Sequence, residues 1–196
     1  MSNEAVKNTI ILFVITLLAG LLLGGVYEIT KNPIAAERKK TKENAYKEVF
    51  QDADTFHELE ISDQIVKDIK QEGMDADIDE IMEAVDQSNN VIGYVLTVTD
   101  HEGYGGDVQF AMGVKEDGTL NAISFLSISE TAGLGMKAKE DTFKNQFSDK
   151  NVDSFVYTKN GASAENEIDA ISGATITTNA VTNGVNAGLR YVRTIK

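Results

Sequence analysis

A stretch near the C-terminus carries four hydroxyl side chains within seven residues: Ser172, Thr175, Thr177 and Thr178. A turn of two small residues, Gly173 and Ala174, precedes a run whose apolar spacing predicts a helix of about 16 residues from Thr177 onward. Such a loop before a helix suits a phosphate group, because the first backbone N–H groups of a helix lack internal partners and its dipole is positive there. The same residues also fit the simpler role of a helix N-cap formed by Ser and Thr.

The order of these residues resembles a modification motif. Asp169, Ser172, Gly173, Ala174 and Thr175 stand in the pattern Asp-x-x-Ser-Gly-Ala-Thr, which resembles the flavinylation motif of the FMN-binding domain family. The chain as a whole is similar to the G subunits of the Rnf complex, an ion-translocating ferredoxin:NAD oxidoreductase of bacterial membranes. The C subunits of the sodium-translocating NADH:quinone reductase are a related family.

The resemblance implies that the chain holds FMN covalently. In the family, a flavin transferase moves the FMN part of FAD onto the last threonine of the motif, here Thr175, and leaves a phosphoester. An alcohol is a poor nucleophile until a base or a metal activates it, so the activating groups would belong to the transferase, and we expect no catalytic residue in this chain. Thr177 and Thr178 fall outside the register of the motif. Asp169 would either order the turn or present a metal to the transferase.

Two glycine-rich segments resemble family segments that line the flavin. Gly103-Tyr104-Gly105-Gly106 is similar to one of them. Ser129–Met136 is similar to the second, Glu-Thr-Pro-Gly-Leu-Gly, with Ala132 in place of the proline. Glycines in both segments would let the backbone come close to a ligand: Gly103, Gly105, Gly106, Gly133 and Gly135.

Side chains of the second segment have expected roles at the flavin. The resemblance implies a hydrogen bond from Thr131 to a polar edge of the ring, and apolar contact from Leu134 and Met136. Glu130 has two alternative roles. It would either serve the flavin site or act as a cap for a helix predicted over residues 137–147.

Electron transfer within a membrane complex is the function that the resemblance implies. FMN would carry the electrons, and the partners would be the other Rnf subunits, both membrane subunits and iron–sulfur or flavin subunits. A stand-alone membrane-anchored covalent flavoprotein, or a quinone-reductase subunit, is the first alternative. The second alternative has no redox role: an anchored scaffold or binding module that uses its glycine-rich loops only for packing.

The composition limits the other functions open to the chain. Its 196 residues include no cysteine, which excludes disulfides, iron–sulfur clusters and zinc held by cysteine. Residues 51–196 carry eleven Lys and Arg against twenty-six Asp and Glu, a net charge of −15. So acidic a part disfavours nucleic acid as a partner, because affinity for phosphate comes from clustered basic residues. His57 and His101 lack the spacing of metal ligands, and we expect both to be ordinary surface histidines.

The N-terminal part predicts a membrane anchor. After a tail of residues 1–8, the run Thr9–Val26 contains no charge and is followed by Tyr27, which predicts a single transmembrane helix over residues 9–27 surrounded by membrane lipid. A cleaved signal peptide is the alternative. The basic residues after the span favour a cytoplasmic globular part, whereas the resemblance implies one outside the cytoplasmic membrane. We follow the resemblance.

The segment after the anchor is less regular. Pro33 is expected to open a connecting helix within residues 28–50, since proline is tolerated in the first turn of a helix. Residues 51–90 are acidic and are predicted to be a variable segment with a helix at Ile78–Val85. The alternating Asp75, Asp77 and Asp79 are interpreted as a solvated face, because an EF-hand loop would need glycine and glutamate where Glu80 and Asp86 stand.

Residues 91–196 are predicted to form the core of an FMN-binding domain. Apolar and alternating runs predict strands at 91–98, 108–114, 120–128, 155–157 and 168–171. Residues 115–118 and 159–162 are predicted to be hairpin turns. The expected fold class is therefore α+β: one N-terminal transmembrane helix followed by antiparallel strands flanked by helices.

Overall fold

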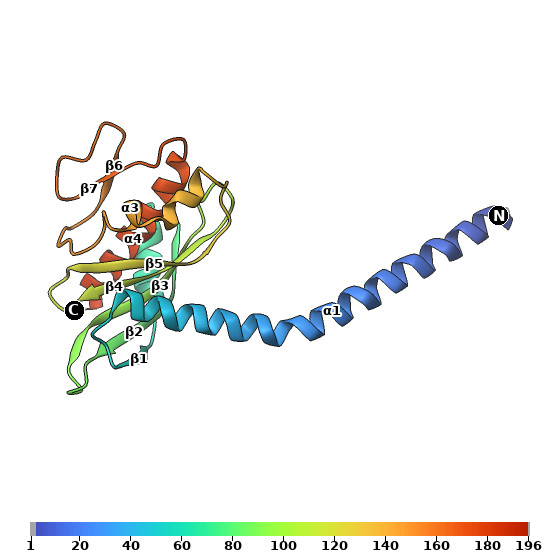
Figure 1. Ribbon diagram of the computed structural model, residues 1–196, viewed down its shortest axis with the longest axis horizontal. Coiled ribbons are helices and arrows are strands. Elements are labelled where there is room, and N and C mark those ends of the chain that lie inside the picture. Colours follow the sequence, from blue (N-terminus) through green and yellow to red (C-terminus); the bar gives the residue numbers. More distant parts are fainter. Residues whose placement is uncertain (1–2, 196) are drawn as a thin grey trace. The chain divides into compact units, whose positions relative to one another are not determined.

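The computed structural model describes residues 3–195 (Figure 1). Its helices are α1 (Asn3–Val49), α2 (Asp63–Gln71), the 3-10 helix η1 (Gly135–Lys139), α3 (Asp141–Lys144) and α4 (Thr175–Ile195). Its strands are β1 (Thr55–Leu59), β2 (Ala76–Val85), β3 (Val91–Asp100), β4 (Val108–Lys115), β5 (Leu120–Ile128), β6 (Val156–Thr158) and β7 (Glu167–Asp169). The chain divides after Thr41 into an N-terminal helical unit and an α+β domain.

The N-terminal unit is part of one continuous helix. α1 runs through Pro33, so the expectation that this proline opens a separate connecting helix is wrong. Proline removes only one backbone hydrogen bond, and the good helix formers at 35–40 continue the helix beyond it. Within residues 3–195, α1 is the one helix long and apolar enough to cross a membrane. Thr9 and Thr16 donate their hydroxyl hydrogens to backbone carbonyls one turn earlier, at 2.9 and 3.0 Å, which satisfies these polar groups in an apolar setting.

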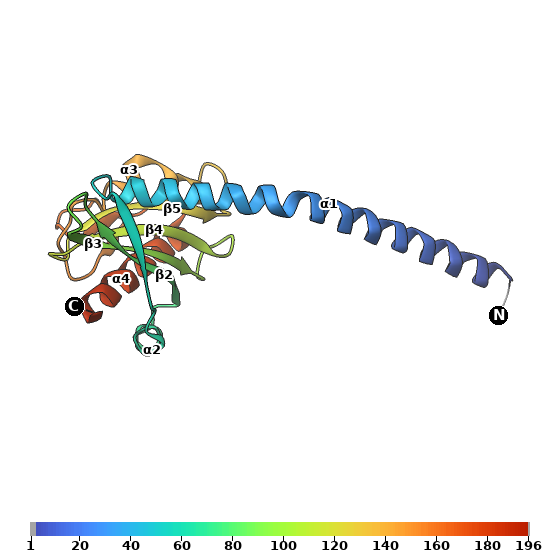
Figure 2. The same ribbon diagram turned by 90° about the horizontal axis from the view of Figure 1, so that it is seen from below.

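The domain is built on a five-stranded antiparallel sheet in the order β1-β2-β3-β4-β5 (Figure 1, Figure 2). Side chains alternate between its two faces, as the pleat of a strand requires. On β4, Phe110 and Met112 belong to the larger core, which includes residues of α4, whereas Ala111 belongs to a smaller core on the other face. The smaller core is formed with the last turn of α1 by Tyr46, Val49 and the following Phe50.

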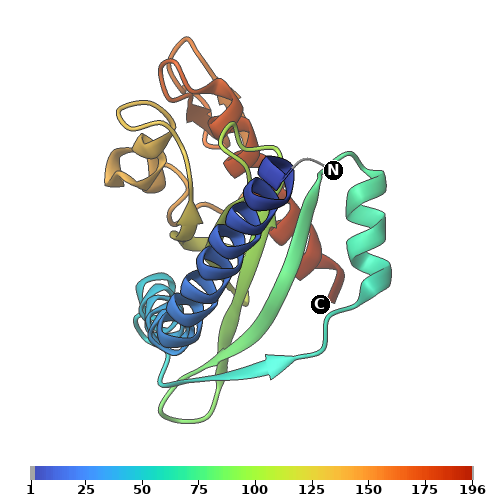
Figure 3. The same ribbon diagram turned by 90° about the vertical axis from the view of Figure 1, so that its right-hand side faces the viewer.

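Small residues let α4 lie close to the sheet. A side-chain carbon added at Gly184 would lie 3.0 Å from the ring of Phe110, and one at Gly188 would lie 2.2 Å from the sulfur of Met112. The two glycines are one turn apart and therefore face the sheet together. Tyr191 on the same helix is fully buried, and its hydroxyl accepts a hydrogen bond from the backbone N–H of Ser62, just before α2, at 2.8 Å. Figure 3 shows α2 at the side of the domain.

The helix predicted at Ile78–Val85 is wrong, because these residues form most of β2. A bulge between Ile78 and Glu80 inserts an extra residue, so Ile78 and Ile81 both enter the core although they are three positions apart. A spacing of three is typical of a helix, and here it comes from a strand with a bulge. The acidic segment 51–90 thus contributes β1, α2 and β2 to the domain.

The strands predicted over residues 91–128 are confirmed, as is the hairpin turn at 115–118, where Gly118 has a φ of +94°. The hairpin predicted at 159–162 is wrong, because β6 and β7 pair in parallel. Gly161 has a positive φ but Asn160 does not, so the tight turn that an Asn-Gly hairpin requires is not formed. The helix predicted over 137–147 is also wrong. Glu140 has an extended backbone and separates η1 from the four-residue helix α3.

Candidate functional site

The structure brings the three predicted segments together around one cleft of about 590 Å³. The loop between β3 and β4, the segment after β5 and the N-terminal turn of α4 each form part of its wall. The lining residues are Tyr104, Glu130, Thr131, Leu134, Gly135, Gly173, Ala174, Thr175, Ile176 and Thr177. Small-molecule sites are typically about 300–1,000 Å³, so the cleft has the size of a cofactor site.

The hydroxyls of the C-terminal stretch differ in their surroundings. Thr178 is fully buried, and its Oγ1 donates to the carbonyl of Ala174 and accepts from the backbone N–H of Ile171, both at 3.0 Å. Thr177 is 1% exposed. Thr175 is the first residue of α4, two positions earlier than predicted, and it is partly exposed at the cleft. Thr175 therefore offers the accessible hydroxyl among the three threonines.

The cleft combines an apolar wall with a helix N-terminus. Tyr104, Leu134 and Ile176 are 72%, 42% and 52% exposed, and all three line it. Exposed apolar side chains that gather around one cleft indicate a binding site for a ligand with an apolar part. In the described chain, the first turn of α4 carries no acidic residue, although the domain as a whole is strongly acidic. This turn is therefore suited to an anion.

Glu130 joins two walls of the cleft. Its Oε1 accepts a hydrogen bond from the backbone N–H of Gly105 at 3.3 Å. A side-chain carbon at Gly135 would lie 2.6 Å from its Oε2, so the absence of a side chain there makes room for the carboxylate. Leu134 and Glu140 occupy the N-cap positions of the two helices that follow, so Glu130 is not the N-cap residue of either one.

The other predicted site residues lie outside the lining of the cleft: Asp169, Ser172, Gly103, Gly105, Gly106, Gly133 and Met136. Asp169 accepts a hydrogen bond at 2.6 Å from the backbone N–H of Ala162, and its own N–H donates to Gln146 Oε1 at 2.6 Å. These contacts order the chain just before the C-terminal turn. Gly106, Gly133 and Gly173 have φ values of +106°, +76° and +77°, which favour glycine at these turns.

Two lining residues were not predicted from the sequence. Ile176 follows Thr175 directly. The signal that could have found it is an apolar residue between the motif and the predicted start of the helix at Thr177. Thr177 lines the cleft although it lies outside the register of the motif.

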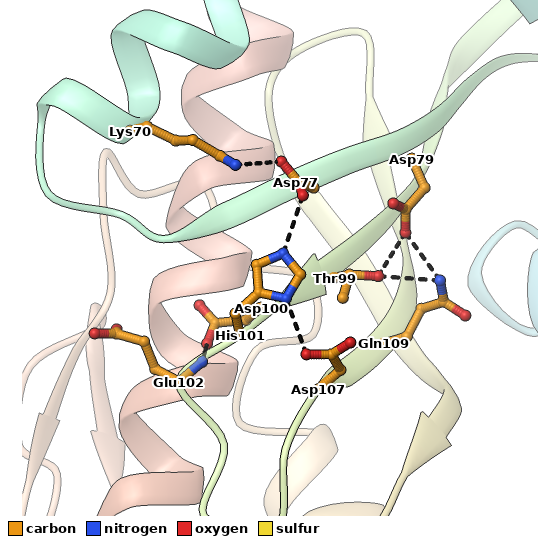
Figure 4. A network of polar contacts seen from close by, with 9 residues as sticks. All are labelled: Lys70, Asp77, Asp79, Thr99, Asp100, His101, Glu102, Asp107 and Gln109. Carbon is orange, nitrogen blue, oxygen red and sulfur yellow. Dashed lines mark hydrogen bonds and ion pairs between the residues drawn. The ribbon is translucent and has the colours of Figure 1, made fainter.

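A polar network lies at the base of the loop between β3 and β4 (Figure 4). His101 lies at the surface, as expected, but it is not without strong partners: it contacts Asp107 through Nδ1 at 2.9 Å and Asp77 through Nε2 at 3.0 Å. The hydrogen bond with Asp107, and then that with Asp77, raises the pKa of His101 to about 9. Asp77 and Asp79, interpreted as a solvated face, are also engaged. Asp77 pairs with Lys70, and Asp79 accepts from Thr99 and Gln109.

Asp100 is buried beside this network. Its side chain is 0% exposed, and one carboxylate oxygen accepts from the backbone N–H of Glu102 at 2.9 Å. Within residues 3–195, the second oxygen, Oδ2, has no hydrogen-bond partner. Burial raises the pKa of Asp100 to about 7, because the charged form is poorly solvated there.

Replacing Asp100 by asparagine is expected to make the protein less sensitive to pH. The folded protein keeps a proton on Asp100 that the unfolded chain loses, so the stability contributed by this group falls as pH rises from 3.8 to about 7. The slope is at most about 1.4 kcal/mol per pH unit. Urea unfolding of the full chain at about pH 5 and about pH 8 measures it. Equal pH dependence in wild type and Asp100→Asn would contradict the burial argument.

Two family models match this chain, one over the domain that holds the cleft and one over the N-terminal helix. Residues 103–190 match the family model of the FMN-binding domain, which includes every residue that lines the cleft. Residues 1–49 match the model of the RnfG N-terminal region.

Similar proteins match along most of the chain. The G subunit of the proton-translocating ferredoxin:NAD(+) oxidoreductase complex of Clostridium ljungdahlii is 33% identical, over 90% of this chain and 85% of that protein. The G subunit of the Na(+)-translocating complex of Acetobacterium woodii is also 33% identical, over 96% and 92%. The crystal structure of the C subunit of Na(+)-translocating NADH-quinone reductase from Parabacteroides distasonis has a TM-score of 0.50 and 20% identity, over 76% of this chain and 81% of that one. This last likeness shows a shared fold.

Proposed function

Because this chain belongs to the family of G subunits of ion-translocating ferredoxin:NAD(+) oxidoreductase complexes, we propose that it carries FMN covalently on Thr175 as a membrane electron-transfer subunit. The observation that carries the covalent linkage is the partly exposed Thr175 hydroxyl at the N-terminus of α4, on the wall of the cleft. Thr177 and Thr178 are only 1% and 0% exposed, so their hydroxyls are less accessible to a transferase than that of the partly exposed Thr175.

The residues of the cleft fit FMN. The N-terminal N–H groups of α4 and its positive dipole would hold the phosphate next to Thr175. Tyr104, Leu134 and Ile176 would contact the isoalloxazine ring, while Thr131 and Glu130 would face its polar edge. When bound, FMN supplies one-electron transfer between neighbouring subunits. The protein would contribute the position of the ring and partial exclusion of water.

The attachment step is a phosphoryl transfer without redox change. The Thr175 oxygen attacks the phosphorus on the FMN side of the FAD pyrophosphate. A new P–O bond forms, the bond to the AMP oxygen breaks, and AMP leaves. The threonine proton goes to a base of the flavin transferase, which also supplies the activation that an alcohol needs. Asp169 bonds to the backbone of Ala162, and we infer that this contact helps to present Thr175, a few residues later, in a fixed geometry.

We place the protein in the cell membrane as a single-pass chain surrounded by lipid, with its domain outside the cytoplasm and the other subunits of the complex as partners. The family relationship and the apolar length of α1 support this arrangement. The segment Thr9–Val26 carries no charged residue, so we assign the ion path to other subunits.

Intact mass measurement of the full chain tests the proposal. The chain is expressed with and without a flavin transferase and purified in detergent. We expect a gain of one FMN residue per chain with the transferase and none without it, and a fluorescent protein band that survives denaturation. Flavin that binds reversibly without a mass gain would refute the covalent linkage.

A further inference from the structure

The loop that carries Tyr104 is closed at its base by one histidine. His101 lies directly after β3 and Asp107 directly before β4, so the contact of Nδ1 with Asp107 Oδ1 at 2.9 Å joins the two ends of the loop (Figure 4). Nε2 contacts Asp77 Oδ2 on β2 at 3.0 Å. The other oxygen of Asp77 pairs with Lys70 of α2 at 2.6 Å. We call His101, Asp77 and Asp107 the His101 clasp.

The tip of the same loop contacts the cleft. The backbone N–H of Gly106 donates to the carbonyl of Gly103 at 3.2 Å, which closes a tight turn around Tyr104. The N–H of Gly105 donates to Glu130 on the opposite wall. Tyr104 itself is 72% exposed, so few contacts of its own fix its position. Its place in the wall therefore depends on how the loop is held at its base and tip.

We propose that His101 is a positioning residue for the flavin: the His101 clasp holds the 101–107 loop so that Tyr104 forms a wall of the cleft. The inference rests on the proposed function for the identity of the ligand, whereas the clasp itself concerns only the loop. His101 does not line the cleft, and it acts through the loop.

The clasp requires a protonated ring. Both ring nitrogens face carboxylates, and only the imidazolium donates from both of them. The charged groups around it are Asp77 and Asp75 from the β2 side, Asp100 and Glu102 on either side in sequence, Asp107 before β4, and Lys70 through Asp77. Because the pKa of His101 is raised from 6.5 to about 9, the stabilisation is complete below 6.5 and is lost as pH rises through about 9.

Hydrogen exchange tests the clasp without flavin. The full chain is expressed without transferase, and amide exchange over residues 101–107 is compared at one neutral pH between wild type, His101→Gln and His57→Gln. We expect about tenfold faster exchange in His101→Gln, because charge-assisted hydrogen bonds at the loop base are lost. His57→Gln, which changes the other histidine, should match wild type. Equal protection of the loop in all three proteins would overturn the proposal.

Flavin fluorescence tests the consequence for the cleft. A phenol ring in contact with the isoalloxazine quenches its emission, so in the flavinylated wild type we expect weak emission that rises as pH passes about 9. His101→Gln should emit strongly at every pH. Asp107→Asn keeps the imidazole and should move the rise down by about one pH unit. The flavin's own proton loss occurs in every variant, so the profile of His101→Gln, which lacks the clasp, is subtracted, and His57→Gln should follow wild type.

The two proposals fail in different ways. Wild-type chain without an FMN mass gain would refute the covalent linkage, and the exchange measurement would still decide whether the clasp holds the loop. Flavinylated wild type whose emission does not change near pH 9, or changes equally in His101→Gln, would overturn the role of His101 at the flavin.

Discussion

Thr175→Ala will abolish covalent flavinylation: the mass gain of one FMN per chain will fall to none. The variant removes the hydroxyl that would form the phosphoester, whereas the fold should persist because Thr175 is only partly buried. The next residues of α4 are held by the buried Thr178, which caps the turn through Ile171 and Ala174. Intact mass after co-expression with the transferase is the measurement, and circular dichroism confirms that helix and sheet are retained.

Ser172→Ala shows which of the two hydroxyls in this turn carries the FMN. Ser172 belongs to the same motif and is exposed, so its hydroxyl is an alternative attachment point, but it lies outside the lining of the cleft. We expect this variant still to be flavinylated, because the Thr175 hydroxyl is retained. If Ser172→Ala loses the mass gain and Thr175→Ala keeps it, the phosphoester lies on the serine and the assignment is wrong.

The family and the sheet could be read from the sequence because their signals are local. The resemblance to Rnf G subunits is confirmed by the two family matches, and each of its segments is contiguous in the chain. Alternating apolar residues predicted β4, and Gly118 marked its turn into β5. The same reasoning wrongly predicted a helix in β2, because the residue inserted at the bulge gives the buried Ile78 and Ile81 the spacing of a helix.

The arrangement of the cleft depends on contacts that sequence spacing does not reveal. Glu130 reaches Gly105 across 25 positions, and His101 reaches Asp77 across 24. Nothing in the local sequence of His101 distinguishes it from His57. Its strong pairing follows from the register of β2 and β3, which sets Asp77 opposite Thr99, two residues before the histidine. A side-chain partner 24 positions away, such as Asp77, can be identified only once the register of the two strands is known.

Gly105→Ala will lower the free energy of unfolding of the domain because of a steric clash, not because of backbone strain. A side-chain carbon at this position would lie 1.8 Å from the carbonyl oxygen of Ser129, a backbone atom that cannot rotate away. The loop must therefore move, and the hydrogen bond from Gly105 to Glu130 is lost. Overpacking together with this loss should cost about 3 kcal/mol. Thermal unfolding of the full chain in detergent should show a midpoint roughly 6–12 °C lower.

Gly106→Ala is the control that separates the two ways in which a substitution at a loop glycine can destabilise the domain: a steric clash and backbone strain. Gly106 has a φ of +106°, but within residues 3–195 no atom beyond its chain neighbours lies within 4 Å of a carbon added there. Its cost should come from strain alone, roughly 1–2 kcal/mol. The bond between Gly105 and Glu130 should survive, so Gly106→Ala should still accept FMN, whereas Gly105→Ala should accept less because one wall of the cleft is displaced. Equal destabilisation by the two variants would mean that the loop can move away from Ser129 at little cost. The close approach of Gly105 to Ser129 would then not fix this wall of the cleft.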